Sequence, residues 1–142
     1  MISWWGAEEV ALDSGRLLIP SRWRSEVNRL YALPWLPHQP EYIKLFSPQR
    51  WARIDEILRH IGLADREKAY IARLLSFYME ELQPDKVGRI RLPQRILDAV
   101  GIQNRAVLVG FGDHFELWSA DRFFAAIQKI QVNEKVIQEL GI

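Results

Sequence analysis

An aspartate and an arginine lie at the two ends of a short turn in the second half of the sequence. Asp85 precedes Arg89 by four residues, and Gly88 stands immediately before the arginine. An aspartate that opens a turn accepts backbone N–H bonds, and its carboxylate can also hold the guanidinium of the arginine. At the edge of a hairpin, such a guanidinium can bind phosphate oxygens or guanine edges bidentately. The turn is therefore a candidate nucleic-acid site, although the same ion pair could serve only to stiffen it.

A shorter copy of this motif lies near the N-terminus. Asp13, Gly15 and Arg16 repeat the order aspartate, glycine, arginine, and both copies reach a proline after three further residues. The glycines of the two copies, Gly15 and Gly88, have an offset of 73. A second echo, Leu-Phe-Ser ending at Ser47 and Leu-Trp-Ser ending at Ser119, has an offset of 72. Two matches in the same order at nearly the same offset indicate an internal duplication.

The apolar pattern predicts the elements that position these motifs. In the first half it predicts strands over residues 7–12 and 17–19, a short helix capped by Ser21 that carries Leu30, an extended proline-rich loop, a strand over 42–46 and a helix opened by Ser47. In the second half it predicts an extended segment over 77–82, strands over 90–92, 106–110 and 114–118, a short helix around Ile96 and a helix capped by Ser119.

The repeated order of elements indicates an α+β fold made of two similar halves. A half of roughly 60 residues buries little surface alone, so we expect the halves to share a pseudo-twofold β-sheet or barrel core, with helices between and after them. The predicted organisation is a first half over residues 1–62 with its proline-rich loop at 34–40, a connecting helix and strand over 63–82, a second half over 77–131 and a C-terminal tail over 132–142. Trp4, Trp5 and Trp35 lie in poorly patterned segments and could cover an oligomer interface.

Positive charge is concentrated around the two turns. The whole chain has a net charge of +1, but residues 13–29 carry +2, residues 85–95 carry +3 and the remainder carries −4. Such a distribution is typical of a protein with one basic face that binds nucleic acid. Solvated arginines that merely cluster in amphipathic segments would give the same count.

The two Asp…Gly-Arg turns and the Leu-Trp-Ser motif, in a chain of 142 residues, resemble the MraZ family of bacterial transcriptional regulators. Members of that family are built from two SpoVT/AbrB-like halves. The resemblance runs from about Leu12 to about Ile130 and is stronger in the second half. It implies a cytoplasmic, nucleoid-associated regulator that binds double-stranded DNA at short promoter repeats of a cell-division and cell-wall gene cluster. It also implies a homo-oligomeric ring and no enzymatic activity.

In the resembling family the hairpins are the part implicated in DNA contact. Matching the motifs assigns that role to Arg89 with Asp85 and to Arg16 with Asp13, while Gly15 and Gly88 shape the turns. Charge and proximity add five candidates for phosphate contact: Arg22, Arg24, Lys86, Arg91 and Arg95. The first turn departs from the pattern, because Asp13 stands three rather than four residues before Arg16. Ser14 and Val87 also replace the usual basic residue before the glycine.

Other chemistries find little support in the sequence. There is no cysteine, and the three histidines show no ligand spacing, so we expect neither a metal site nor a cofactor. Asp13 and Asp85 could in principle act as paired catalytic carboxylates, but their places beside turn arginines favour a structural role. No apolar run is long enough to cross a membrane, and no motif indicates a small-molecule substrate. The alternative function is an AbrB-like antitoxin or protein-interaction module, which would use the apolar tail from Val132 to Ile142.

Overall fold

The computed structural model describes residues 2–34, 40–62 and 64–142. The first half of the chain forms β1 (Trp4–Asp13), β2 (Arg16–Leu18), α1 (Ser21–Arg24), β3 (Leu30–Pro34), β4 (Tyr42–Phe46) and α2 (Pro48–Arg59). A connecting helix, α3 (Arg66–Tyr78), follows. The second half forms β5 (Glu80–Leu82), β6 (Arg89–Arg91), α4 (Gln94–Ala99), β7 (Arg105–Gly112), β8 (His114–Ser119) and α5 (Ala120–Lys129), and α6 (Glu134–Glu139) ends the chain.

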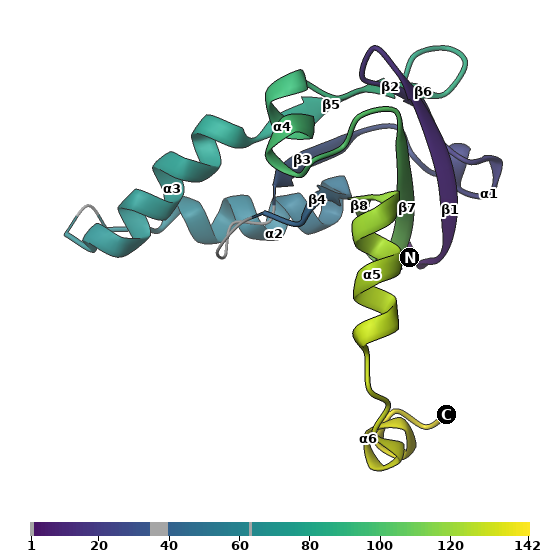
Figure 1. Ribbon diagram of the computed structural model, residues 1–142. Coiled ribbons are helices and arrows are strands. Elements are labelled where there is room, and N and C mark those ends of the chain that lie inside the picture. The colour runs from purple at the N-terminus through teal and green to yellow at the C-terminus, as the bar shows by residue number, and fades with distance from the viewer. Residues whose placement is uncertain (1, 35–39, 63) are drawn as a thin grey trace.

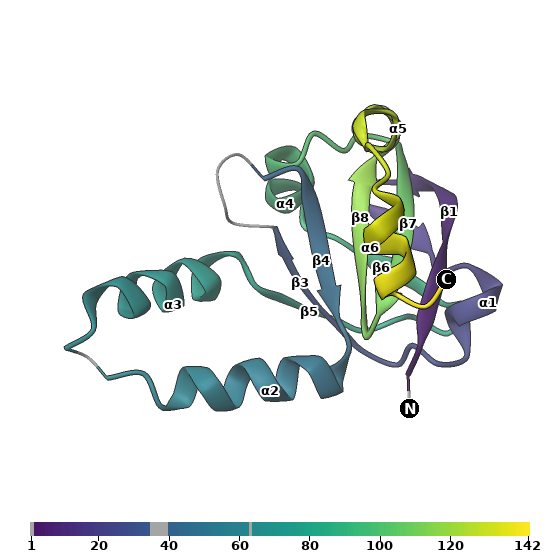
Figure 2. The same ribbon diagram turned by 90° about the horizontal axis from the view of Figure 1, so that it is seen from below.

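The eight strands form one antiparallel sheet in the order β5-β3-β4-β8-β7-β1-β2-β6, which curls into a nearly closed barrel (Figure 1). The two end strands, β5 and β6, are joined by the turn that contains Asp85. Helices α2 and α3 project together from one side of the barrel, as the view from below shows (Figure 2). The α+β fold with a shared barrel core is therefore confirmed. No helix among the described residues is long and apolar enough to cross a membrane.

The duplication is visible in the strand register as a pseudo-twofold axis. Leu17 of β2 lies directly opposite Ile90 of β6, and the offset between them is 73. At another point of the barrel, Lys44 of β4 lies opposite Glu116 of β8, with an offset of 72. Each pair consists of equivalent residues from the two halves, so the axis passes through both pairs.

Backbone hydrogen bonds on either side of the first pair obey the same symmetry. The Ile19 N–H donates to the Gly88 carbonyl over 3.0 Å, and the Leu92 N–H donates to the Gly15 carbonyl over 2.8 Å. The two donors occupy equivalent positions of the two halves, and so do the two acceptors. The two turns are thus built into one ribbon by reciprocal bonds between the halves.

The core fills the barrel with apolar side chains from both halves. Trp4 is 1% exposed and stacks on Phe115 with ring centroids 4.3 Å apart, and Trp23 meets the same ring edge-on at 4.9 Å. Leu17 and Ile90 are buried beneath the ribbon. These contacts link the N-terminal strand, α1 and β8 into one apolar cluster.

Several details of the first half were predicted wrongly. Leu30 begins β3 instead of belonging to a helix, because α1 ends at Arg24. The proline-rich loop was expected to include Pro34, but Pro34 is the last residue of β3 and lies opposite Ile43. A proline is tolerated there because it ends the strand. Residues 35–39 of that loop, with Trp35, lie outside the described residues. Trp4 is a core residue, not part of an oligomer surface.

Two of the three predicted capping serines cap their helices. The Ser47 and Ser119 hydroxyls accept hydrogen bonds from the Arg50 and Arg122 N–H groups, so the two caps of the second echo are equivalent in structure as well as in sequence. Asp65 caps α3 through the Lys68 N–H. Ser21 was expected to cap α1, but it is the first residue of the helix, and Pro20 stands at the cap position.

Candidate nucleic-acid interface

The two duplicated motifs meet where β2 pairs with β6, the last two strands of the sheet; these two strands are called the ribbon below, although β2 also pairs with the end of β1. Arg16 lies opposite Arg91, and Leu18 lies opposite Arg89. Directly opposed residues project from the same face of a sheet, and residues two apart along a strand share that face. All four side chains are exposed, while Leu17 and Ile90 between them are buried. The outward face of the ribbon therefore carries three arginines and one leucine, drawn from both halves.

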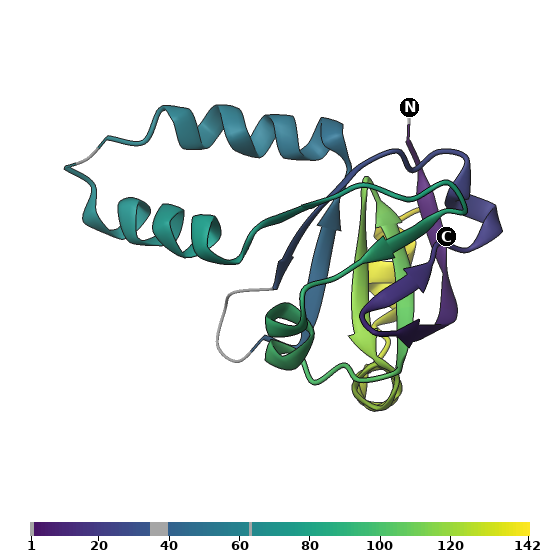
Figure 3. The ribbon, with the colours of Figure 1, turned by 90° about the horizontal axis from the view of Figure 1, so that it is seen from above.

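This ribbon occupies one end of the molecule. Figure 1 places β2 and β6 at the opposite end from α6, and the view from above shows the two strands side by side across the barrel (Figure 3). The turns that border the ribbon, at residues 13–16 and 85–89, belong to different halves. The structure thus brings together Arg16, Arg89 and Arg91, which are far apart in the sequence.

The second turn is organised by the carboxylate of Asp85. Its Oδ1 accepts hydrogen bonds from the Val87 and Arg89 N–H groups, each over 2.9 Å, and its Oδ2 accepts one from Arg89 Nε over 3.0 Å. The bond from the Arg89 N–H is the main reason why the pKa of Asp85 lies below its ordinary value, and the bond from Val87 and the guanidinium of Arg89 act in the same direction. The ionised carboxylate therefore fixes both the backbone of the turn and the orientation of the Arg89 head group.

The first turn has a different construction. Only Ser14 and Gly15 separate Asp13 from Arg16, and these flanking residues lie opposite each other at the end of β1 and β2. Both loop residues have positive φ angles, 51° for Ser14 and 79° for Gly15, as in a two-residue type I′ hairpin. Within the described part of the chain, the side chains of Asp13 and Arg16 have no hydrogen-bond or ion-pair partner. The missing residue thus removes the carboxylate–guanidinium clamp that the second turn has.

A side chain at either turn glycine would also meet a neighbour, the Leu92 backbone at Gly15 and the Arg24 side chain at Gly88. A Cβ atom on Gly88 would lie 2.6 Å from Cδ of Arg24, and a Cβ atom on Gly15 would lie 2.7 Å from the carbonyl oxygen of Leu92. The predicted turn-shaping role of both glycines therefore has a steric basis beyond their positive φ angles.

The other predicted cations fall into two groups. Arg22, Arg24 and Arg95 are engaged with the protein itself: Arg22 Nη1 is 3.2 Å from Glu8 Oε1, Arg24 Nε donates to the Ile19 carbonyl over 2.9 Å, and Arg95 pairs with Glu80. Lys86 and Arg91 are exposed, and in the described ranges their side chains have no such partner. Lys86 and Arg91 are thus freer to meet an external anion than the first three.

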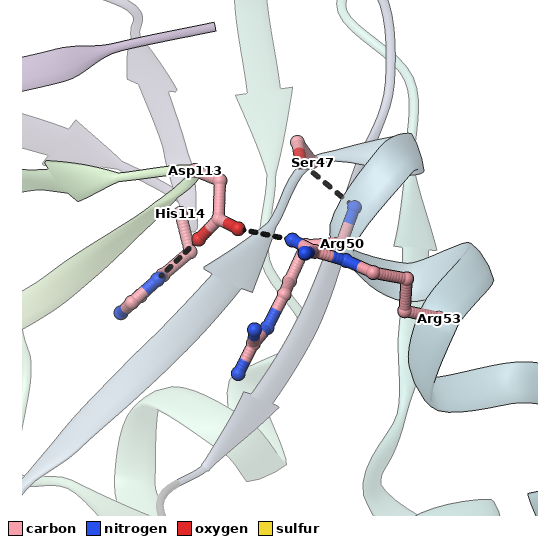
Figure 4. A network of polar contacts seen from close by, with 5 residues as sticks. All are labelled: Ser47, Arg50, Arg53, Asp113 and His114. Atoms are coloured by element: carbon pink, nitrogen blue, oxygen red, sulfur yellow. Dashed lines mark hydrogen bonds and ion pairs between the residues drawn. The ribbon is translucent and has the colours of Figure 1, made fainter. Parts of the chain in front are cut away.

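A second polar cluster, which sequence reasoning missed, joins the start of α2 to the turn between β7 and β8 (Figure 4). Arg53 pairs with Asp113 Oδ2, and His114 Nδ1 is 3.2 Å from Asp113 Oδ1. Burial acts to raise the pKa of Asp113, but the hydrogen bond with His114 and the charges of Arg50, His114 and Arg53 outweigh it, and the pKa lies below its ordinary value. Arg53 and Asp113 come from different halves of the chain, so no local pattern could have linked them. The cluster ties two elements together and lies away from the ribbon.

Metal coordination finds no candidate in the described ranges, where no group of three or more His, Asp or Glu side chains converges. His60 pairs with Glu56, and His114 pairs with Asp113. His38 lies outside the described residues. Asp13 and Asp85, considered above as paired carboxylates, border opposite ends of the ribbon, beside Arg16 and Arg89 respectively.

The fold and the ribbon define a class of protein in which two duplicated halves close one barrel and present their paired hairpin strands at one end. The sequence model of the family described as “MraZ protein, putative antitoxin-like” matches residues 79–139, which is the second half with the tail. A protein named transcriptional regulator MraZ from Stenotrophomonas maltophilia (strain R551-3) is 31% identical over 126 residues, covering 86% of this chain and 85% of the relative.

Two further relatives bear the same name. The one from Methylobacillus flagellatus is 28% identical over 134 residues, covering 92% of this chain and 90% of the relative. The one from Xylella fastidiosa (strain Temecula1) is 32% identical over 121 residues, with 82% of each chain covered. The chain belongs to the MraZ family, a family of transcriptional regulators, as the two turns and the Leu-Trp-Ser motif suggested.

Proposed function

We propose that this protein is a sequence-specific DNA-binding transcriptional regulator that inserts the β2–β6 ribbon into the major groove of double-stranded DNA. The observation that carries the proposal is the outward face of the ribbon, where Arg16, Arg89 and Arg91 from both halves lie together. A pair of antiparallel strands is narrow enough to enter the major groove, and β1 borders this pair only through Leu12 and Asp13. The names of the relatives support a role in transcription.

The arginines of the ribbon differ in how they would act. Arg89 is oriented by Asp85, and a guanidinium held in one direction suits bidentate contact with a base edge. Lys86, Arg16 and Arg91 are free to follow phosphate oxygens, which position the protein without reading sequence. Arg22, Arg24 and Arg95 would contribute to DNA contact only if they released their present partners.

So few contacts in one chain would bind DNA weakly and with strong salt dependence. We therefore propose that the protein acts as a homo-oligomeric ring, whose linked ribbons engage several short promoter repeats at once, upstream of a cell-division and cell-wall gene cluster. Simultaneous contacts raise the effective concentration of each further ribbon at its repeat. The protein would work in the cytoplasm, associated with the nucleoid, and without catalysis, cofactor or small-molecule substrate.

A second candidate function is binding of a protein partner, as in an antitoxin. The observation that favours it is the C-terminal tail: α6 lies away from the barrel and has no buried residue (Figure 1), and Val132, Val136, Leu140 and Ile142 are exposed. The description of the matching family also contains the word antitoxin. An amphipathic tail of this kind could fold against an apolar groove of a partner.

Fluorescence-anisotropy titration tests the first proposal. The probe is duplex DNA with the repeats from upstream of the protein's own gene, the control is a scrambled duplex, and each titration is run at several salt concentrations. Arg89→Ala should weaken specific binding by about five- to hundredfold. Arg16→Ala should cost less, because Arg16 is not held in place. The matched control is Arg59→Ala, since Arg59 Nε pairs with Asp55 Oδ2 at 3.1 Å on α2, far from the ribbon.

The regulator proposal is overturned if native protein binds the repeat duplex and the scrambled duplex with equal affinity. It is also overturned if Arg89→Ala binds the repeat duplex as tightly as Arg59→Ala does. Recovery of a stoichiometric protein partner that is lost when residues 132–142 are removed would then favour the antitoxin-like function.

A further inference from the structure

Leu18 is an apolar side chain in the middle of a cationic surface. It is 44% exposed, and it shares the outward face of the ribbon with Arg16, Arg89 and Arg91. The duplication makes its position equivalent to that of Arg91, since the offset between the two is again 73. The pseudo-symmetric ribbon is therefore chemically asymmetric: one half presents two arginines and the other presents an arginine and a leucine.

Leu18 also lies next to Arg89, whose head group is held by the Asp85 carboxylate. It lies directly opposite Arg89, so the two Cβ atoms are about 4.5–5.5 Å apart, as in any cross-strand pair. Val87, which is 57% exposed, stands two residues before Arg89 in the turn. The guanidinium that Asp85 orients thus has an apolar neighbour across the strand and another in its own turn.

We propose that Leu18 is a specificity-determining residue that contacts the C5-methyl group of a thymine in the major groove, next to the base that faces Arg89. This inference rests on the proposed DNA-binding function. A charged phosphate has no apolar surface that a leucine side chain could contact. Among the four bases, thymine alone presents a methyl group to the major groove. Successive base pairs are about 3.4 Å apart, so neighbouring side chains of a cross-strand pair can reach neighbouring bases.

The contribution of one thymine methyl contact to DNA affinity is large enough to measure. Removing one methyl group from water corresponds to roughly a fourfold gain in affinity. A leucine exposed on an ordinary protein surface would give no such effect, because scattered exposed leucines are common and have no partner. Sensitivity to the thymine methyl group therefore separates the two interpretations.

The experiment compares the duplex from upstream of the protein's own gene with the same duplex synthesised with deoxyuridine in place of thymidine. Deoxyuridine keeps base pairing and removes only the methyl group. Native protein should bind the thymidine duplex about fourfold more tightly for each methyl contact. Leu18→Ala should bind the thymidine duplex as weakly as native protein binds the deoxyuridine duplex, and should lose no further affinity on the latter. Single deoxyuridine replacements then locate the contacted base.

Leu74→Ala is the matched control, because Leu74 is 42% exposed on α3 and far from the ribbon. Thermal unfolding of both variants checks that they are folded. Val87→Ala is measured in parallel: if it abolishes the methyl sensitivity and Leu18→Ala does not, the assignment to Leu18 is wrong. Equal affinity of native protein for the two duplexes also overturns the inference while leaving the regulator proposal intact. Failure to distinguish either duplex from scrambled DNA overturns both.

Discussion

The two hairpin turns come from one duplicated motif and border the same ribbon, but they are held in different ways. The second turn is fixed by a side chain, since the Asp85 carboxylate accepts two backbone N–H groups and the Arg89 head group. The first turn is fixed by its backbone alone, through two residues with positive φ. The first turn is one residue shorter than the second and has a tight two-residue loop in place of the clamp.

The position and the orientation of an arginine are therefore separate properties. Strand pairing sets the positions, so Arg16 and Arg89 are both on the outward face. The carboxylate sets the orientation, and only Arg89 has it. An arginine that is already oriented loses less side-chain entropy when it binds, so we expect Arg89 to dominate recognition although the ribbon is nearly symmetric.

Substituting the two aspartates one at a time tests whether the two turns differ in function. In Asp85→Asn the amide oxygen still serves the turn backbone, but the charge that holds the guanidinium is lost. Specific DNA binding should weaken by about threefold to tenfold, measured by fluorescence anisotropy. Asp13→Asn removes a negative charge that holds nothing and would repel phosphates, so binding should be unchanged or slightly tighter. Effects of the same sign and size in both variants would show that the two turns work alike.

The pH dependence of protein stability below pH 7 tests the clamp between Asp85 and Arg89 separately from DNA binding. The pKa of Asp85 is lowered in the folded protein, so its ionised form stabilises the fold at pH values above the unfolded-state pKa of about 3.9. That contribution disappears as the pH falls through the lower, folded-state pKa. Native protein should therefore be more stable than Asp85→Asn at pH 6–7, and the gap in urea midpoints should close below about pH 4.

Asp113 also has a lowered pKa, but it is present in both proteins, so its contribution cancels in the difference between them. The difference in stability between native protein and Asp13→Asn provides the reference, because the first turn has no clamp to lose. A gap between native protein and Asp85→Asn that stays constant from pH 7 to pH 3 would contradict the clamp.

The sequence anticipated the parts of the fold that depend on local or repeated signals. The repeated spacing of Gly15 and Gly88 led to the shared barrel, and serine caps marked the starts of α2 and α5. The pairing of Leu17 with Ile90 could not be predicted from the sequence, because a repeat shows that two halves are alike but not which strands pair. For the same reason Leu18 was overlooked: only the register places it opposite Arg89 and among the arginines.

The miss at Pro34 has a local cause. Pro34 was assigned to a loop because proline disrupts central strands, but at the last residue of β3 that rule does not apply. The roles of Arg22, Arg24 and Arg95 stay predictions: they were assigned from charge and proximity, and each of the three side chains has a partner within the chain. The charge of a side chain can be read from the sequence, but its partner within the folded chain cannot.

The smallest predicted effect concerns the backbone of the first turn. Ser14 has a φ of 51°, and it is the one residue other than glycine with a positive φ in the described part of the chain. Asparagine adopts this conformation more readily than serine and is favoured in type I′ hairpins. Ser14→Asn should raise the free energy of unfolding by about 0.5–1 kcal/mol, seen as a rise of a few degrees in Tm, and leave DNA binding unchanged. Lys86→Asn is the contrasting change in the second turn, where the φ angle is already negative, and it should not stabilise. A stabilisation by Lys86→Asn as large as that by Ser14→Asn would mean that strain at Ser14 is not what distinguishes the two turns.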